Sequence, residues 1–239
     1  MKTIAVTAAT PVELSALVKA FGAQRNPESL PWDIFVAQDS SSRIIFTISG
    51  IGTANASAAA ALAAHLFAPQ LMITTGCAGA YPGCGLNIGD IALATAEIFA
   101  DAGVAIPEGW RTLEHIGIPL LEQNGNRYFN EIALSRQANR AALHLADSLG
   151  TALFPGKFLT VATCSGTTAR GVELKNRFDG LCENMEGAAV ALVAARYGIE
   201  CLEIRGISNQ VENRDISCWD VGLASAKAQL FLEQFIRNY

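Results

Sequence analysis

Three short segments carry side chains that suit acid–base chemistry on a polar ligand. TPVE ends on Glu13, NMEG contains Glu186, and RGISN begins with Arg205 and ends with Asn209. A carboxylate can take a proton from water or accept hydrogen bonds from a diol. An amide offers a donor group and an acceptor group side by side, whereas arginine is a permanent cation. We therefore take these four residues as the first candidates for a site.

Glu13 also has a purely structural interpretation. Thr10, Pro11 and Glu13 stand at the spacing of a capping box, with threonine at the N-cap, proline at the first helical position and glutamate at the third. A carboxylate folded back on the N-cap amide is less free to hold a water molecule. The sequence alone leaves both roles open.

The other candidates have structural alternatives as well. Glu183 and Glu186 could stabilise a helix N-terminus through the helix dipole. Arg205 could pair with Glu203 or with another acid, and Asn209 could be a turn residue. A choice between these roles depends on where the elements place the side chains.

The spacing of apolar residues predicts alternating strands and helices. We expect strands at 3–9, 34–37, 43–49, 71–76, 91–99, 158–164 and 201–208, and helices at 10–21, 53–67, 133–150, 187–198 and 219–236. This order indicates an α/β fold in which residues 1–239 form a single three-layer domain, with a mostly parallel, mixed central sheet flanked by helices. Ligands bind at the carboxyl ends of such strands, so we expect the site at 9–13, 50–53, 76–81, 164–168 and 205–209.

Composition excludes several classes of partner. Of the 239 residues, 51% are hydrophobic and 16% are charged, and the net charge is −5. The low charged fraction predicts extensive buried surface, including a subunit interface, and there is no basic field for nucleic acid. No apolar run reaches the roughly 18 residues of a membrane span. The N-terminus leads straight into a strand pattern, and the six cysteines form no C-x-x-C motif. We expect a reduced, cytoplasmic protein without a metal site.

Taken together, the segments resemble one superfamily over essentially the whole chain: the nucleoside phosphorylases and nucleosidases, which cleave N-glycosidic bonds. AVTAATPVEL is similar to the strand, turn and helix that carry the hydrolases' catalytic glutamate, and TTGCAGAY to the loop flanking ribose and base. NMEGAAVA is similar to the ribose clamp and RGISN to the purine site. The resemblance implies catalytic roles for Glu13, Arg205 and Asn209, and substrate contacts for Cys77, Ala78, Gly79, Met185, Glu186 and Ser208.

Within this superfamily, residues 76–104 and 183–211 resemble the futalosine hydrolases of a menaquinone biosynthesis route. The adenine-releasing methylthioadenosine and S-adenosylhomocysteine nucleosidases carry aspartate where Asn209 stands. A 6-oxopurine needs a donor at O6, which an amide supplies and a carboxylate lacks. The resemblance thus implies release of hypoxanthine, with Ser208 orienting Asn209. It implies no metal or organic cofactor and at least a homodimer.

Water is favoured over phosphate as the attacking group. A phosphorylase binds phosphate dianion, usually through arginines, yet the turn after the first strand holds Glu13 and no cation. The alternatives are an adenine-type nucleosidase, a purine nucleoside phosphorylase and a non-catalytic nucleoside-binding protein. Futalosine carries an aryl carboxylate on its 5′ extension, and we expect it near the following side chains: Phe99, Tyr128, Arg111, Arg127 and Arg170.

Two positions depart from the adenine-type pattern. Asn184 stands where those enzymes carry an acid, and Cys77 where they often carry serine. The segment between Ser165 and Met185 is also shorter than in those relatives, and it offers no clear counterpart of the aromatic residue that stacks on their base. The ribose contacts are therefore less specified by the resemblance than the base contact.

Overall fold

The computed structural model describes residues 1–26, 31–123 and 125–239. Its main sheet contains β1 (Lys2–Ala8), β2 (Gln24–Arg25), β3 (Asp33–Gln38), β4 (Ser42–Ile48), β5 (Leu71–Ala80), β6 (Ile91–Phe99), β11 (Glu131–Ala133), β12 (Leu153–Thr160), β13 (Gly180–Asn184) and β14 (Glu200–Gln210). Two hairpins lie apart from it: β7 (Gly103–Ile106) with β8 (Gly109–Thr112), and β9 (Leu121–Gln123) with β10 (Asn126–Tyr128).

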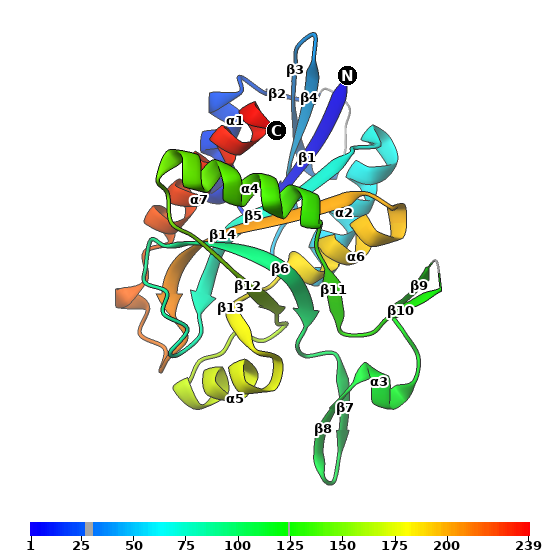
Figure 1. Cartoon of the computed structure of the whole chain (residues 1–239), viewed down its shortest axis with the longest axis vertical. Helices are drawn as coiled ribbons and strands as arrows, with labels where there is room; N and C mark the ends of the chain where they lie inside the picture. Colours follow the sequence, from blue (N-terminus) through cyan, green and yellow to red (C-terminus); the bar gives the residue numbers. More distant parts are fainter. Residues whose placement is uncertain (27–30, 124) are drawn as a thin grey trace.

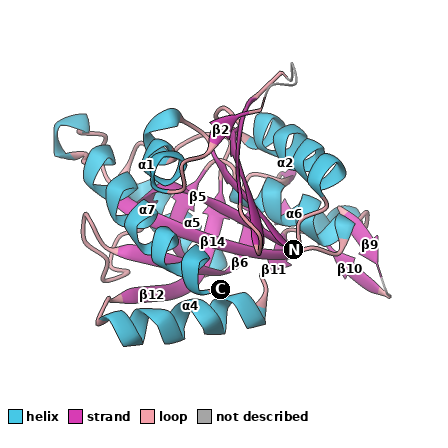
Figure 2. Ribbon diagram, turned by 90° about the horizontal axis from the view of Figure 1, so that it is seen from above, coloured by secondary structure: helices cyan, strands magenta, loops and turns pink. Residues whose placement is uncertain are grey.

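The helices are α1 (Ser15–Ala20), α2 (Thr53–Phe67), α3 (Leu113–Ile116), α4 (Arg136–Leu149), α5 (Thr168–Phe178), α6 (Gly187–Tyr197) and α7 (Val221–Asn238). Short 3₁₀ turns precede α1 and α7, namely η1 (Pro11–Glu13) and η2 (Ile216–Cys218). Helices α1, α4 and α7 cover one face of the sheet and α2 and α6 cover the other, as Figure 1 and Figure 2 show. This confirms the three-layer α/β arrangement.

The sheet is mixed. Its long central pairings, such as β1 with β4, β5 with β14 and β6 with β12, are parallel, whereas β2–β3, β3–β4 and β6–β11 are antiparallel. Five strands also close on themselves, because β5 pairs with β14, β14 with β6, β6 with β12, β12 with β13, and β13 with β5. We call these five strands the ring; three of them, β5, β13 and β14, carry residues of the site described below.

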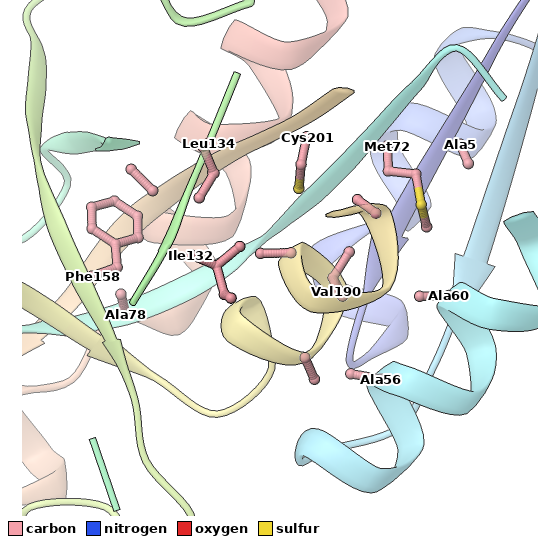
Figure 3. Packing of buried hydrophobic residues seen from close by; sticks show 14 of the residues in the cluster. Ala5, Ala56, Ala60, Met72, Ala78, Ile132, Leu134, Phe158, Val190 and Cys201 are labelled. Atoms are coloured by element: carbon pink, nitrogen blue, oxygen red, sulfur yellow. The ribbon is translucent and has the colours of Figure 1, made fainter. Parts of the chain in front are cut away.

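Successive side chains along each strand point to opposite faces of the sheet, and both faces are covered by helices. In β1, Ala5 packs with the α2 and α6 side, whereas Ile4 and Val6 pack with the α1, α4 and α7 side. Small residues let α2 and α6 approach closely: Ala56 and Ala60 lie opposite Val190 in Figure 3. The period-two signal and the alanine-rich signal in the sequence both arise from this packing.

Several element boundaries differ from the expectation. The helix expected at 10–21 is divided, because Leu14 takes a non-helical conformation between η1 and α1. Strands β5 and β14 run on through the residues expected to follow strand ends, because the two strands keep pairing as far as Ala80 and Gln210. Strand β12 lies at Leu153–Thr160 rather than at 158–164. Helix α5 and strand β13 had not been expected at all.

Candidate active site

One cavity gathers the residues singled out in the sequence. It has a volume of about 230 Å³ and is lined by all nine of them: Glu13, Cys77, Ala78, Gly79, Met185, Glu186, Arg205, Ser208 and Asn209. A larger cavity of about 540 Å³ lies near Lys2 and Tyr239, and none of these nine residues lines it. We take the smaller cavity as the candidate active site because of the chemistry that it brings together.

Glu13 both caps the first turn and faces the cavity. Its Oε2 accepts hydrogen bonds from the backbone N–H and the hydroxyl of Thr10, at 3.0 and 2.8 Å. Its Oε1 accepts from the backbone N–H of Cys77 at 2.9 Å. These bonds fix the orientation of the carboxylate, which is only 4% exposed. The two roles weighed from the sequence are therefore compatible, since a carboxylate has about four acceptor sites.

Arg205 lies in the middle of β14 with its side chain buried. Its Nε donates to Glu203 at 2.7 Å, and one terminal nitrogen lies 3.4 Å from Glu186 Oε2 and 3.3 Å from the carbonyl of Cys77. Burial would lower the arginine pKa, but the surrounding carboxylates raise it. Arg205 thus stays charged, and the pairing with Glu203 considered in the sequence is present together with the contact to Glu186.

Glu186 is held from two directions. Its Oε1 accepts from the backbone N–H of Gly52 at 2.9 Å, and its Oε2 faces Arg205. The residue stands immediately before α6 and is 6% exposed. Met185 lies beside it, with its sulfur 3.4 Å from that of Cys164. The arrangement leaves carboxylate lone pairs for hydroxyl groups of a ligand.

Asn209 is a strand residue, so its expected alternative as a turn residue is wrong. Its Oδ1 accepts from the hydroxyl of Ser208 at 2.7 Å, and its Nδ2 donates to the carbonyl of Gln210 at 3.0 Å. A primary amide has two N–H groups and two acceptor lone pairs. One donor and one acceptor therefore remain for a ligand, and the hydroxyl of Ser208 contacts the amide oxygen.

Two polar residues differ from their interpretation in the sequence. Glu183 does not stand at a helix N-terminus: it belongs to β13, where it accepts from the backbone N–H of Ser165 at 2.8 Å and the hydroxyl of Tyr81 at 3.1 Å. Burial raises its pKa. Asn184 turns inward, and its Oδ1 accepts from the backbone N–H groups of Glu186 and Gly187, at 2.9 and 2.7 Å. Asn184 thus secures the start of α6.

Sequence reasoning missed part of the cavity wall. Ile51 and Trp219 line the cavity, and Ile51 is exposed. Val161, Cys164 and Ser165 complete the wall from the segment after β12. Ile51 lies in the expected site range 50–53, and Cys164 and Ser165 lie in the expected range 164–168, so the sequence had already placed these three near the site. Trp219 had no signal, because it opens the expected helix 219–236, outside the ranges expected for the site.

The side chains proposed for a 5′ extension lie elsewhere in this chain. Arg127 pairs with Glu122, Arg170 pairs with Asp101 and Glu173, and Arg111 bonds the carbonyl of Trp110. None of them lines the cavity, nor do Phe99 and Tyr128. That any of them binds a 5′ extension stays a prediction.

The electrostatics of the cavity suit water better than an anion. Among the described residues that line it, the carboxylates are Glu13, Glu183 and Glu186, and the cation is Arg205, already paired with Glu203. Burial raises the pKa of the Cys77 thiol to about 12, so this cysteine is a neutral wall residue. Over the described residues, no group of three or more His, Cys, Asp or Glu side chains is arranged to hold a metal ion. No described helix is long and apolar enough to span a membrane.

A glycine provides the room that Glu13 needs. Gly76 has φ +144°, and a Cβ there would lie 2.4 Å from Glu13 Oε1 and 2.9 Å from an Arg205 nitrogen. We expect Gly76→Ala to displace both groups and to lower activity about 10- to 100-fold. Backbone strain should also cost about 1–3 kcal/mol.

The matched control is Gly85→Ala, since Gly85 has φ +86° but nothing within 4 Å of a Cβ. It should show a comparable stability loss in thermal unfolding with activity intact. Equal activity in both variants would contradict the steric argument.

Comparisons with known proteins show the family to which the chain belongs. Residues 3–238 match the Phosphorylase superfamily. The chain is 36% identical over 161 residues to futalosine hydrolase of Acidothermus cellulolyticus, covering 64% of this chain and 58% of that relative. It is 33% identical over 195 residues to futalosine hydrolase of Thermus thermophilus, covering 80% and 82%.

The fold has a close counterpart among solved structures. A futalosine hydrolase mutant of Helicobacter pylori superposes with a TM-score of 0.86 over 100% of both chains, at 21% identity. This likeness shows a common fold, while the sequence matches show common descent. The chain therefore belongs to the Phosphorylase superfamily and, within it, to the family of the futalosine hydrolases.

Proposed function

We propose that this protein hydrolyses the N-glycosidic bond of futalosine, releasing hypoxanthine and dehypoxanthine futalosine in menaquinone biosynthesis. The observation that carries the proposal is the placement of two groups on one cavity: a pinned carboxylate, Glu13, and an amide with one free donor and one free acceptor, Asn209. The first suits an attacking water, and the second suits a 6-oxopurine.

The proposed reaction begins with stretching of the bond between the ribose C1′ and the purine N9. As electron density moves into the base, N7 takes a proton from solvent; the free N–H of Asn209 donates to O6 and its Oδ1 accepts from the N7–H, so both bonds strengthen in the transition state. Glu186 holds the ribose hydroxyls and favours the cationic sugar. Glu13 orients the water and takes its proton. The reaction as proposed uses no metal and no organic cofactor.

Arg205 supports these two carboxylates in the proposal. Its contact with Glu186 and its position next to Glu13 let one guanidinium orient both. A phosphate dianion would have to enter beside Glu13 and Glu186 without an unpaired cation among the described lining residues, which disfavours phosphorolysis.

The size of the cavity bears on the 5′ extension. At about 230 Å³ it lies below the usual 300–1,000 Å³ of ligand pockets. A nucleoside can occupy it, and the aryl extension would then leave past Ile51 and Trp219. We propose that a second copy of the chain covers this exit, which would make the enzyme a homodimer or larger assembly. Its compartment would be the cytoplasm.

Base release from three nucleosides in phosphate-free buffer tests the proposal. Futalosine should yield hypoxanthine, whereas methylthioadenosine and inosine should react slowly or not at all. Adenine released from methylthioadenosine at a higher rate would refute the role of Asn209. Turnover that starts only when phosphate is added would refute the role of Glu13.

A further inference from the structure

Beneath the cavity lies a pair of carboxyl groups that the proposed reaction does not use. Glu97 belongs to β6 and Glu203 to β14, and both are fully buried. Thr160 of β12 and Asn184 of β13 contact the same pair, so four strands of the ring contribute to the cluster. Two buried acids side by side are costly unless they share a proton or face a cation.

The two carboxyl groups point at one spot. A Cβ on Gly187 would lie 2.2 Å from Glu97 Oε1 and 2.4 and 2.5 Å from the two oxygens of Glu203. Only a glycine leaves room for both groups under the start of α6. Both carboxyl groups thus converge on the same small space, and a hydrogen bond between them requires one proton shared by the pair.

The surroundings decide which acid carries that proton. Glu203 Oε1 accepts from Arg205 Nε at 2.7 Å, so the cation favours an ionised Glu203. Among the described residues no cation contacts Glu97, which accepts from Thr160 Oγ1 at 2.7 Å and from Asn184 Nδ2 at 2.5 Å. Burial first, and then the charge of Glu203, raises the pKa of Glu97 well above its usual value. Glu203 Oε2 has no donor among the described hydrogen bonds, and a proton on Glu97 would fill that place.

We propose that ionised Glu203 is a positioning residue for the nucleosidase reaction and that Glu97 is its neutral, proton-donating partner. Glu203 fixes the guanidinium of Arg205, whose other nitrogens reach the carbonyl of Cys77 and the carboxylate of Glu186. Glu97 fixes Asn184, whose Oδ1 accepts from the first N–H groups of α6. The pair thus holds Glu186 in two ways. Glu203 acts on its carboxylate through Arg205, and Glu97 acts on its backbone N–H through Asn184. The inference rests on the function proposed above.

The charge of Glu203 also affects the proposed base. The ionisable groups around Arg205 are Glu203, Glu186 and Glu13, and the thiols of Cys182 and Cys201 near the pair are kept neutral because burial raises their pKa. If Glu203 loses its charge, Arg205 is less neutralised and stabilises the ionised form of the remaining carboxylates more strongly. The acid limb of the kcat/KM profile then moves to lower pH.

Two isosteric variants separate this role from a purely structural one. Glu203→Gln should lower kcat between about 10-fold and 100-fold and move the acid limb about one pH unit lower. Glu97→Gln keeps an N–H that can donate to Glu203 but loses the acceptor for Asn184 Nδ2, so kcat should fall less than in Glu203→Gln, with the limb unmoved. Glu203→Asp, which restores the charge, should bring the limb back. Equal effects of the two glutamine variants, or an unmoved limb in Glu203→Gln, would overturn the proposal.

Infrared spectroscopy gives a readout that does not depend on turnover. The unmodified protein at neutral pH should show the band of a buried, protonated carboxyl group, and Glu97→Gln should lack it. Absence of the band from the unmodified protein would overturn the inference, even if Glu203→Gln failed to fold. Kinetics use whichever nucleoside the unmodified enzyme turns over. If it turns over none, the proposed function fails, while the band still decides the protonation of the pair.

Discussion

Glu13→Gln is expected to lower kcat by about 10²–10⁴ with little change in KM. The amide keeps an oxygen that can accept from Thr10 or Cys77, so the local fold should persist, but it cannot take the proton of the attacking water. Because one capping or backbone bond is lost, the free energy of unfolding should fall by about 1 kcal/mol. Steady-state rates of base release and thermal unfolding measure the two effects separately.

Ser135→Ala is the control for the capping part of this result. Ser135 caps α4 by accepting from the N–H of Ala138 at 3.1 Å, and it does not line the cavity. The variant should lose a similar amount of stability and keep full activity. If Glu13→Gln instead retained kcat within a few-fold, Glu13 would be a capping residue only.

Asn209→Asp is expected to lower kcat/KM for futalosine by about 10³–10⁴. A carboxylate has no donor for O6 of the base. It also leaves the carbonyl of Gln210 facing an oxygen instead of the present N–H at 3.0 Å, which should cost about 1–3 kcal/mol of stability. The ratio of kcat/KM for methylthioadenosine to that for futalosine should rise. The two substrates are measured in parallel with the same enzyme preparation.

Ser208→Ala distinguishes base selection from general damage to the site. It removes the hydroxyl that lies 2.7 Å from Asn209 Oδ1 but keeps the donor and acceptor of the amide. The rates with both nucleosides should fall about tenfold, with their ratio unchanged. An unchanged ratio in Asn209→Asp as well would show that this position does not select the base.

Local sequence patterns determined much of the fold because they report spacing along one chain. The alanine-rich pattern predicted a helix at 53–67, where α2 lies, and the apolar run predicted a strand at 91–99, where β6 lies. TPVE predicted the capping box, in which the Glu13 carboxylate accepts from the backbone N–H of Thr10, three positions earlier. Strand β13 escaped because its five residues include the charged Glu183, which resembles a helix start.

The site, like the fold, was determined partly by the sequence and partly by the tertiary structure. Residue types and the family resemblance identified the nine residues that meet at the cavity. They also pointed to the choice between a carboxylate and an amide at position 209. Only the tertiary structure showed that Glu13 serves as cap and cavity residue at once, since its third bond comes from Cys77, 64 positions away. It alone placed Trp219 in the wall.

The buried acid pair could not be found in the sequence at all. Glu97 and Glu203 lie on strands that are more than 100 residues apart in the sequence. Each by itself resembles an ordinary acid in an apolar strand. They meet because β14 pairs with β6 when the ring closes, and Gly187 leaves the space for both. Spacing along the chain specifies which residues share a strand or a helix. Pairing between distant strands decides which of their acids lie close enough to share a proton.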